Sequence, residues 1–445
     1  MSDTKWNHEV DVVVIGSGAA AHLAALTAAE NGVNVIMVEK AAEIGGTTAR
    51  SGGGFWIPNN RFQKENGIKD NREYALPYMA RYSFPQLYNP EDQYFGLPEH
   101  EYKLMSTYYD TASKVAEFME KTGKIKLMMD VNWTGNPNVD YMDSYPENRG
   151  VRGRTLFTVD PEGNRGMGFE LIRQLGVWRD RLNIPVLLSH RAVEILTNHE
   201  GEVLGVTALK GGEEVNISAR KAVIFGSGGF THNPEMMLRF QRGPSMGGCA
   251  APTNTGDFVL MGGAVGAQLG NMANAFRGEV VLEQALNDPE GIHNIWWLIG
   301  DSMLAVNKFG RRVMNEKRSY PDRSMVHFVW DPVRGEWTNM LLFAIYDQRA
   351  ADLWPGFPPI QDNGGAADHV INGETLEELA DNISLRLEKL SGSIGGFKLD
   401  QDFKANLKET VERFNRFAGT GADEDFHRGE YDYDREWGAM PPMIP

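Results

Sequence analysis

Residues 10–60 read VDVVVIGSGAAAHLAALTAAENGVNVIMVEKAAEIGGTTARSGGGFWIPNN, and this stretch decides the fold of the chain. The uncharged, β-branched run at 12–15 is typical of a buried parallel strand. A segment rich in Ala and Leu follows to about residue 31, and a second buried run at 33–38 ends at Glu39. The pattern predicts a strand, a helix and a second strand, which together form the β-α-β unit of an α/β fold.

The turn between the first strand and the helix has the spacing of a phosphate-binding turn. Gly16 would permit a tight turn, Gly18 would let the backbone approach a phosphate, and Ala21 would let the helix pack closely on the strand. The N-terminus of the helix offers N–H groups to an anion, and Glu39 lies where an acid accepts ribose hydroxyls. The unit predicts dinucleotide binding. The alternative is an ordinary glycine turn in an α/β protein.

Length, charge and composition limit the class of protein further. The chain has 445 residues, a length that predicts two domains, and its net charge of −16 argues against nucleic acid or an anionic membrane surface as a partner. Residues 12–29 are uncharged, but their glycines and polar residues favour strand plus helix over a membrane span. The first ten residues hold no apolar signal core, which predicts a cytoplasmic protein. A single cysteine, Cys249, and ten scattered histidines predict no internal disulfide and no metal site.

A glycine-rich stretch, IGGTTARSGGG at 44–54, follows the second strand. Its five glycines in eleven residues predict a loop, not a stable helix or strand. Such a loop suits close approach of the backbone to a flat ligand. A flexible surface linker is the alternative, but the apolar residues 55–57 follow at once and need burial. Four side chains of this loop could bind the ligand by hydrogen bonds, namely Thr47, Thr48, Arg50 and Ser51.

The motifs GSGAAA, VEK, GGTTARSGGG and FWIPNN, in this order, resemble those of the fumarate reductase and 3-ketosteroid dehydrogenase superfamily of flavoproteins. The ending SGGGFWIPNN is most similar to the 3-ketosteroid Δ1-dehydrogenase branch. The resemblance implies a Rossmann-like FAD-binding domain, with a parallel sheet plus a β-meander, and an inserted α+β cap domain. Succinate dehydrogenases attach their flavin covalently to a histidine of this loop. No histidine lies between His22 and His100 here, so the resemblance implies non-covalent FAD.

The resemblance covers nearly the whole chain and suggests its domain boundaries. We expect an FAD-binding domain at 1–277, with an insertion at about 60–150, and a cap or substrate domain at 278–440. Family members continue beyond the point where this chain stops, back into the flavin domain, and we expect that segment to be absent. Helices are predicted at 167–178, 375–389 and 403–417, a loop at 420–436, and an antiparallel meander at 186–189, 192–196, 203–209 and 215–218, before a parallel strand at 221–225.

A second glycine turn, GSGG at 226–229, follows that parallel strand. It is a poor fingerprint for a second dinucleotide, because Thr231 replaces the small third residue and no strand ending in an acid follows. It resembles instead the turn with which the superfamily returns to the same FAD. Asp257 resembles a flavin contact, or it is a plain N-cap. The residues expected to bind FAD are Gly16, Ser17, Gly18, Ala20, Ala21, Glu39, Lys40, Gly45, Gly46, Thr47, Thr48, Arg50, Ser51, Gly52, Gly53, Val193, Gly226, Ser227, Gly228, Gly229, Asn254, Gly256 and Asp257.

The catalytic candidates are two tyrosines. In fumarate reductases the position of Tyr320 is a proton-donating arginine, whereas in 3-ketosteroid dehydrogenases it is the tyrosine that removes a proton, so the resemblance implies a base at Tyr320. Pro321 disfavours helical geometry at Tyr320 and predicts an extended or turn segment. The stretch YMDSYPE at 141–147 resembles one whose tyrosine supports that base; Tyr145 is the better match and Tyr141 the second. The alternative for both candidates is a packed aromatic residue beside a proline.

The resemblance implies an FAD-dependent dehydrogenase that introduces a C=C bond next to a ring ketone, with 3-ketosteroid 1,2-desaturation as the first choice. Tyr320 would remove the C2 proton, while the C1 hydrogen would leave as hydride to the flavin. The partners would be a ring ketone, best matched by a steroid, and an external electron acceptor. The alternatives are a Δ4-(5α) ketosteroid dehydrogenase, an enoate reductase like fumarate reductase, or an inactive partial flavoprotein chain.

Overall fold

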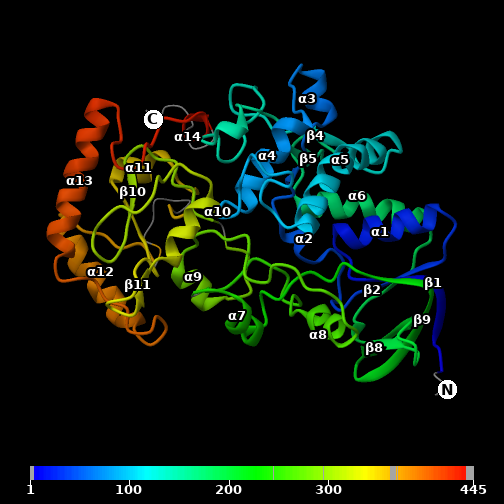
Figure 1. Ribbon diagram of the computed structural model, residues 1–445. Coiled ribbons are helices and arrows are strands. Elements are labelled where there is room, and N and C mark those ends of the chain that lie inside the picture. Colours follow the sequence, from blue (N-terminus) through cyan, green and yellow to red (C-terminus); the bar gives the residue numbers. More distant parts are fainter. Residues whose placement is uncertain (1–4, 244, 294, 361–366, 368, 437–445) are drawn as a thin grey trace.

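The structure, a computed structural model, describes residues 5–243, 245–293, 295–360, 367 and 369–436. The main sheet lies at one side of the molecule and α12 (Leu376–Leu390) and α13 (Phe403–Thr420) lie at the opposite side (Figure 1). The segments between these two parts carry most of the residues that line the cavity described below.

The main sheet has six strands in the order β6-β2-β1-β9-β8-β7. β1 pairs in parallel with β2 and with the second half of β9, while the first half of β9 pairs with β8, and β8 with β7, in antiparallel fashion. The predicted parallel sheet with an attached meander is therefore confirmed. The strands are β1 His8–Ile15, β2 Val35–Val38, β6 Val186–Leu187, β7 Arg191–Thr197, β8 Val203–Lys210 and β9 Glu213–Phe225.

Two details of the predicted meander are wrong. β6 is not part of it, because Val186 pairs in parallel with Met37 of β2. The two strands expected at 215–218 and 221–225 are one continuous strand, β9. The sequence from 213 to 225 contains neither glycine nor proline, so nothing interrupts the strand where its pairing changes from β8 to β1.

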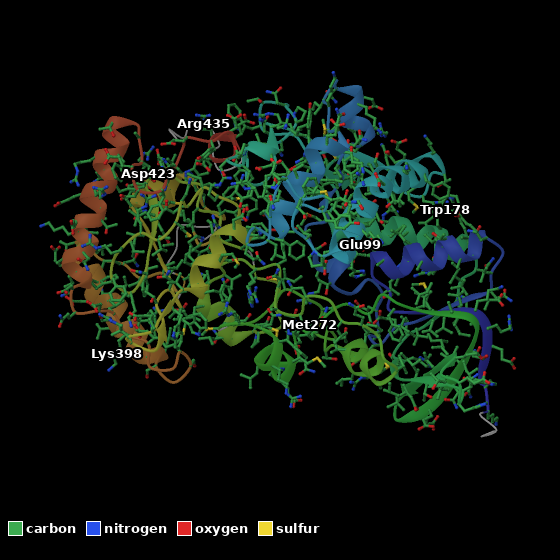
Figure 2. The ribbon with its side chains drawn as sticks, viewed as in Figure 1. Glu99, Trp178, Met272, Lys398, Asp423 and Arg435 are labelled. Atoms are coloured by element: carbon green, nitrogen blue, oxygen red, sulfur yellow. The ribbon has the colours of Figure 1, made fainter. Side chains whose placement is uncertain are left out.

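The alternating side chains of β1 enter two different cores. Val12 and Val14 pack with α1 (Ala19–Glu30) and α6 (Gly168–Arg181) on one face of the sheet. Trp178, labelled in Figure 2, packs against the same cluster from α6. Val13 and Ile15 pack with the meander on the other face. Both faces of β1 are thus buried, as the uncharged run at 12–15 predicts.

Residues 46–158 form helices and a small sheet of order β3-β5-β4, and the insertion expected at about 60–150 stays a prediction. Arg154, fully buried, joins these parts through Asp70 at 2.8 Å and Asp140 at 2.6 Å. The elements are α2 Gly46–Arg50, β3 Phe55–Trp56, α3 Arg61–Glu65, α4 Arg72–Ser83, α5 Glu99–Lys121, β4 Leu127–Met129, a 3₁₀ turn Pro146–Asn148 and β5 Thr155–Thr158.

The remaining elements follow the meander along the chain. The helices predicted at 375–389 and 403–417 are present as α12 and α13, but α14 occupies part of the stretch predicted as a loop at 420–436. These elements are α7 Pro234–Phe240, α8 Asp257–Ala264, α9 Leu282–Asn287, β10 Met303–Val306, α10 Tyr320–Arg323, a 3₁₀ turn Ser324–Phe328, β11 Trp330–Asp331, β12 Glu336–Trp337, β13 Phe343–Tyr346, α11 Gln348–Leu353 and α14 Asp432–Glu436.

Within the described part of the chain, no helix combines the length and the apolar character needed to cross a bilayer. The same residues include no group of three or more His, Cys, Asp or Glu side chains placed to hold a metal ion. The expected domain boundaries at 277 and 278 stay a prediction.

Candidate active site

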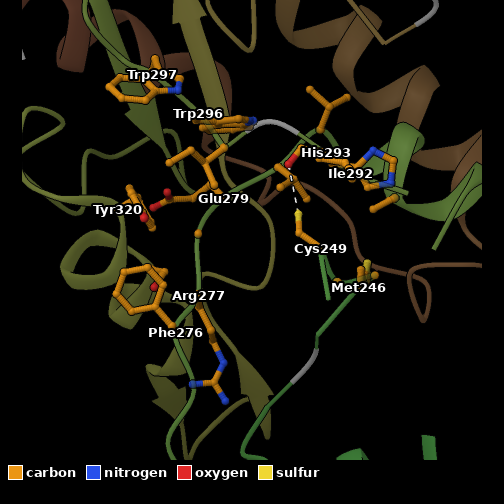
Figure 3. Close-up of a pocket in the computed structure, with 18 of the residues that line it drawn as sticks. Met246, Cys249, Phe276, Arg277, Glu279, Ile292, His293, Trp296, Trp297 and Tyr320 are labelled. Carbon is orange, nitrogen blue, oxygen red and sulfur yellow. Dashed lines mark hydrogen bonds between the residues drawn. The ribbon is translucent and has the colours of Figure 1, made fainter. Parts of the chain in front are cut away.

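A cavity of 2430 Å³ runs from the glycine turns of the main sheet to residues beyond 276. Typical ligand pockets measure about 300–1,000 Å³, so this one has room for more than one small ligand. We call the part lined by the turns at 16–18 and 226–229, together with Glu39 and Lys40, the nucleotide end. The part lined by Tyr141, Tyr320 and Tyr433 is the tyrosine end, and Figure 3 shows the wall around Tyr320.

The two glycine turns touch each other at the nucleotide end. Gly16 has φ of 101°, and a Cβ there would lie 2.5 Å from the carbonyl oxygen of Gly226. A Cβ on Gly226 would in turn lie 2.9 Å from the backbone nitrogen of Ala21. Only glycine satisfies both positions, because the backbones themselves fill the space. The turn at 226–229 therefore belongs to the same site as the turn at 16–18.

The surface that these turns present suits the pyrophosphate of a dinucleotide. Gly18 is the N-cap of α1 and supplies no side chain, so the first N–H groups of the helix face an open turn. Thr48 Oγ1 accepts a hydrogen bond from one of these groups, the Ala19 N–H, at 3.2 Å. Asn254 also lines the cavity, and its buried Oδ1 has no partner among the described residues. The residues present therefore fit FAD.

The charged side chains at the nucleotide end are paired. Ser17 Oγ donates to Glu39 Oε2 at 2.6 Å, and the Ala41 N–H donates to Glu39 Oε1 at 2.7 Å. Asp257 binds Lys40 at 3.0 Å and Arg191 at 2.8 Å. Burial opposes the charge of Asp257, but the two cations outweigh it and hold the pKa of this carboxyl below its usual value.

The alternative role of Asp257 as an N-cap is wrong. Gly256 is the N-cap of α8, and Asp257 is the first residue of the helix. The side chain of Asp257 turns to the two cations and not to the backbone N–H groups of the helix.

The loop predicted at 44–54 is wrong in one respect, because it contains the short helix α2. The glycines lie at both ends of this stretch, and Thr47 to Ser51 include none, so one helical turn forms between them. The Arg50 guanidinium donates to the backbone carbonyls of Cys249 and Glu290.

Most residues predicted to bind FAD line this cavity. Four do not, and of these Ala21 packs behind the glycine turns, while Ala192, the neighbour of Val193 in the sequence, does line the cavity. The four are Ala20, Ala21, Gly45 and Val193. The residues that do line it are Gly16, Ser17, Gly18, Glu39, Lys40, Gly46, Thr47, Thr48, Arg50, Ser51, Gly52, Gly53, Gly226, Ser227, Gly228, Gly229, Asn254, Gly256 and Asp257.

Tyr320 lies in the wall of the tyrosine end. Its ring packs edge to face with that of Phe276, with centroids 5.3 Å apart at 88°. Tyr320 is the first residue of α10, so the predicted extended or turn geometry is wrong at this position. Pro321 is tolerated because it falls in the first turn of a helix, where its missing N–H would have no partner.

Of the two candidates for supporting Tyr320, the structure places Tyr141 in the cavity wall and not Tyr145. Tyr145 packs instead under the guanidinium of Arg81, whose central carbon lies 4.3 Å from the ring centroid. Burial raises the pKa of Tyr141, and the nearby Tyr320 adds to that shift. This placement favours Tyr141 over Tyr145 as the supporting tyrosine, and the role itself stays a prediction. Tyr433, with its ring centroid 6.0 Å from that of Tyr141, is a third tyrosine that the sequence did not indicate.

The arginines near Tyr320 in sequence are occupied elsewhere. Arg318 binds Asp143 at 2.8 Å and Asp434 at 3.1 Å. Arg323 binds Glu279 at 3.0 Å. Burial raises the pKa of the Tyr320 phenol above its usual value. The phenol is therefore protonated at neutral pH before a substrate binds.

Sequence reasoning missed the segment that faces Tyr320, which contains Phe276, Arg277 and Glu279 (Figure 3). Glu279 is buried, and its Oε1 has no hydrogen-bond partner among the described residues. The only available signal was the presence of two charged residues in the otherwise mostly apolar stretch FRGEVV at 276–281.

The chain matches the family model described as FAD binding domain over residues 11–444, and it belongs to this family. Its relatives include a 3-oxosteroid 1-dehydrogenase of Mycolicibacterium smegmatis, which is 31% identical over 97% of this chain and 81% of the relative.

Two solved structures share the fold. The 3-ketosteroid Δ1-dehydrogenase of Sterolibacterium denitrificans in complex with 1,4-androstadiene-3,17-dione has a TM-score of 0.79 at 21% identity, over 99% of this chain and 84% of that one. The 3-ketosteroid-Δ4-(5α)-dehydrogenase of Rhodococcus jostii in complex with 4-androstene-3,17-dione has a TM-score of 0.66 at 21% identity, over 96% and 80%. The predicted fold class and the FAD cofactor are confirmed, and the chain is an FAD-dependent oxidoreductase.

Proposed function

We propose that this oxidoreductase introduces a C=C bond next to the carbonyl of a ring ketone, and that the reaction is 3-ketosteroid 1,2-desaturation. One observation carries the proposal: the Tyr320 phenol lies in the wall of a cavity that continues to the dinucleotide-binding turns. The 31% identity to a 3-oxosteroid 1-dehydrogenase supports it. A tyrosine at this position is also the residue by which the sequence resembles ketosteroid dehydrogenases and departs from fumarate reductases.

The nucleotide end would hold FAD through its backbone. The turn at 16–18 and the N-terminus of α1 would bind the pyrophosphate, and Glu39 would accept ribose hydroxyls. Bound FAD would supply the acceptor for the hydride that leaves C1. FAD would be held non-covalently, because the loop that carries a histidine in succinate dehydrogenases contains no histidine here.

Tyr320 would take the C2 proton, but a buried neutral phenol is a poor base by itself. Tyr320 can accept that proton only as the phenolate, after its own proton has passed to solvent as the substrate binds. Tyr141 is within electrostatic reach of Tyr320, and a hydrogen bond between their two phenols would spread the developing charge over both oxygens. The ring of Phe276 would hold the Tyr320 ring in position through their edge-to-face contact.

The electrons would pass from FAD to an external acceptor other than a nicotinamide dinucleotide. The second glycine turn, at 226–229, contacts the first one and lines the same nucleotide end, so it offers no separate dinucleotide site.

The test is the visible spectrum of the purified protein under anaerobic conditions, before and after addition of a saturated 3-ketosteroid. We expect a flavin band that bleaches, followed by a product with its new double bond between C1 and C2. A new bond between C4 and C5 would instead assign the Δ4-(5α) reaction. A flavin band that stays oxidised would refute the steroid substrate, and the absence of any flavin band would favour an inactive partial chain.

A further inference from the structure

Arg277 lines the cavity immediately after Phe276, whose ring packs on Tyr320 (Figure 3). Its guanidinium donates to Gln241 Oε1 and, at 3.5 Å, to the carbonyl oxygen of Ala275. Its central carbon lies 4.8 Å from the ring centroid of Phe328. All these partners are neutral, and among the described residues no carboxylate forms an ion pair with Arg277.

The other cations of the cavity wall differ from Arg277. Three of them are paired with carboxylates: Lys40 with Asp257 at 3.0 Å, Arg165 with Asp130 at 3.5 Å and Arg386 with Glu283 at 2.9 Å. Arg50 also lacks a carboxylate, but its guanidinium donates to the backbone carbonyls of Cys249 and Glu290.

A shortage of acids does not explain the unpaired state of Arg277. The chain has 60 acidic and 44 basic residues. Glu279, two positions further along the same segment, has its ion-pair partner in Arg323 at 3.0 Å. Arg277 is thus a cation in a binding cavity without the counter-ion that its neighbours have.

Arg277 is half-buried, and burial alone lowers its pKa because no nearby anion compensates for the lost hydration. A guanidinium presents parallel N–H donors that match a carboxylate in a bidentate fashion. The ring of Phe328 lies against the guanidinium and lowers the local dielectric constant, which strengthens such a pair.

We propose that the ring-ketone substrate carries a carboxylate and that Arg277 binds this group, an assignment that rests on the proposed function. Phe276 contacts Tyr320 and Arg277 follows it directly, so the base and the anion-binding residue face one cavity. Arg277 is then the residue that selects acidic ring ketones over neutral ones. The carboxylate belongs either to the side chain of a steroid or to a single ring.

The test uses the FAD-loaded protein and two pairs of ligands. One pair is a 3-ketosteroid with a carboxylated side chain and its amide, and the other is a cyclohexanone carrying one carboxylate and its amide. The dissociation constants come from titration calorimetry and kcat/KM from reduction of a dye. We expect the wild-type protein to prefer the acid of one pair, and Arg277→Gln to reduce that preference about 10- to 100-fold.

The matched control is Arg386→Gln, which removes a cavity-lining arginine that already has a carboxylate partner, and we expect it to leave the ratio of acid to amide unchanged. Arg277→Lys keeps the charge without the planar donors, and we expect it to retain part of the preference. The pair that shows the preference identifies the source of the carboxylate.

Three results would overturn the assignment: a wild-type protein that does not distinguish either acid from its amide, an Arg277→Gln variant with the same preference as wild type, or loss of FAD from that variant. Turnover of ring ketones without any preference for acids would refute the assignment and leave the proposed function in place. A preference for acids in binding that depends on Arg277, without turnover of any ring ketone, would support the assignment and refute the proposed function.

Discussion

At the nucleotide end of the cavity the backbone forms the binding surface, whereas at the tyrosine end side chains from distant segments form it. Gly16 and Gly226 touch through main-chain atoms, and Gly18 caps α1 without a side chain. The tyrosine end brings together residues 141, 320 and 433, which lie on three separate stretches of the chain.

The difference between the two ends shows what each can tolerate. At the nucleotide end, where backbones are in contact, an added Cβ should disrupt the structure most, because no flexible side chain can move aside. At the tyrosine end, loss of a phenol oxygen should have the largest effect, because the proposed proton transfer depends on it. We therefore expect substitutions at the two ends to separate FAD binding from turnover.

The largest effect is expected for Tyr320→Phe, which removes the proposed base and keeps the ring that packs on Phe276. Turnover should fall about 10²- to 10⁴-fold, the usual contribution of a general base, while the flavin content stays the same. Stopped-flow measurement of flavin reduction checks it. Tyr145→Phe is the matched control and should retain activity, because Tyr145 does not line the cavity. Full activity of Tyr320→Phe would refute the assignment of the base.

Gly16→Ala should have the next largest effect, and this effect should appear at the nucleotide end of the cavity. The new Cβ would lie 2.5 Å from the carbonyl oxygen of Gly226 and would require φ of 101° from an alanine. We expect a loss of about 2–3 kcal/mol in stability and a low ratio of flavin to protein. The absorbance ratio at the flavin and protein bands measures this. Gly32→Ala is the control, because Gly32 also has a positive φ but its Cβ would meet no atom within 4 Å; equal losses in both variants would show that the contact between the turns is unimportant.

Asp257→Asn should have a smaller effect, also confined to the nucleotide end. It leaves Lys40 and Arg191 without their anion, and we expect a loss of about 1–2 kcal/mol, less than for a fully buried pair because Arg191 is half exposed. The pKa of Asp257 is lowered in the folded state, so its contribution is present above the unfolded pKa of about 3.9 and is lost as the pH falls through the lower folded value. Urea titrations between pH 3 and 7 should show a steeper loss for wild type than for the variant.

The smallest expected effect concerns His22, which is fully buried in α1 and whose pKa is lowered by that burial. Below the unfolded pKa of about 6.5 the unfolded state binds a proton that the folded state does not, so stability should fall as the pH decreases from 6.5. The slope from this group is at most about 1.4 kcal/mol per pH unit. Thermal unfolding of His22→Gln should show a flatter pH dependence, whereas His199→Gln should not, because the His199 side chain is 90% exposed.

The sequence predicts the nucleotide end well because its determinants are local. The strand, the glycine turn, the helix and Glu39 lie within about 30 consecutive residues, and their spacing carries the information. The errors in the predicted strands arose where pairing with a distant segment determines the structure. β6 pairs in parallel with β2, with Val186 opposite Met37. The residues of β6 alone do not indicate this partner.

The tyrosine end is predicted only in part, because contacts between distant segments define it. Tyr141 and Tyr145 are four residues apart and chemically alike, and only the positions of Arg81, Tyr320 and Tyr433 separate them. In the sequence Arg277 is visible only as a charge in the mostly apolar stretch 276–281, because its distinguishing property is that no carboxylate among the described residues pairs with it in three dimensions.

The unbroken strand β9 joins the meander to the parallel core, because its first half pairs with β8 and its second half with β1. Opening one half of this strand strains the other, so the two parts should exchange their backbone amide hydrogens with solvent as one cooperative unit. The slowest exchange should lie at 215–225, on both sides of the point where the pairing changes. The turn at 226–229 begins where this strand ends, so the paired strand would hold the glycines of the turn in place while the surrounding chain opens locally.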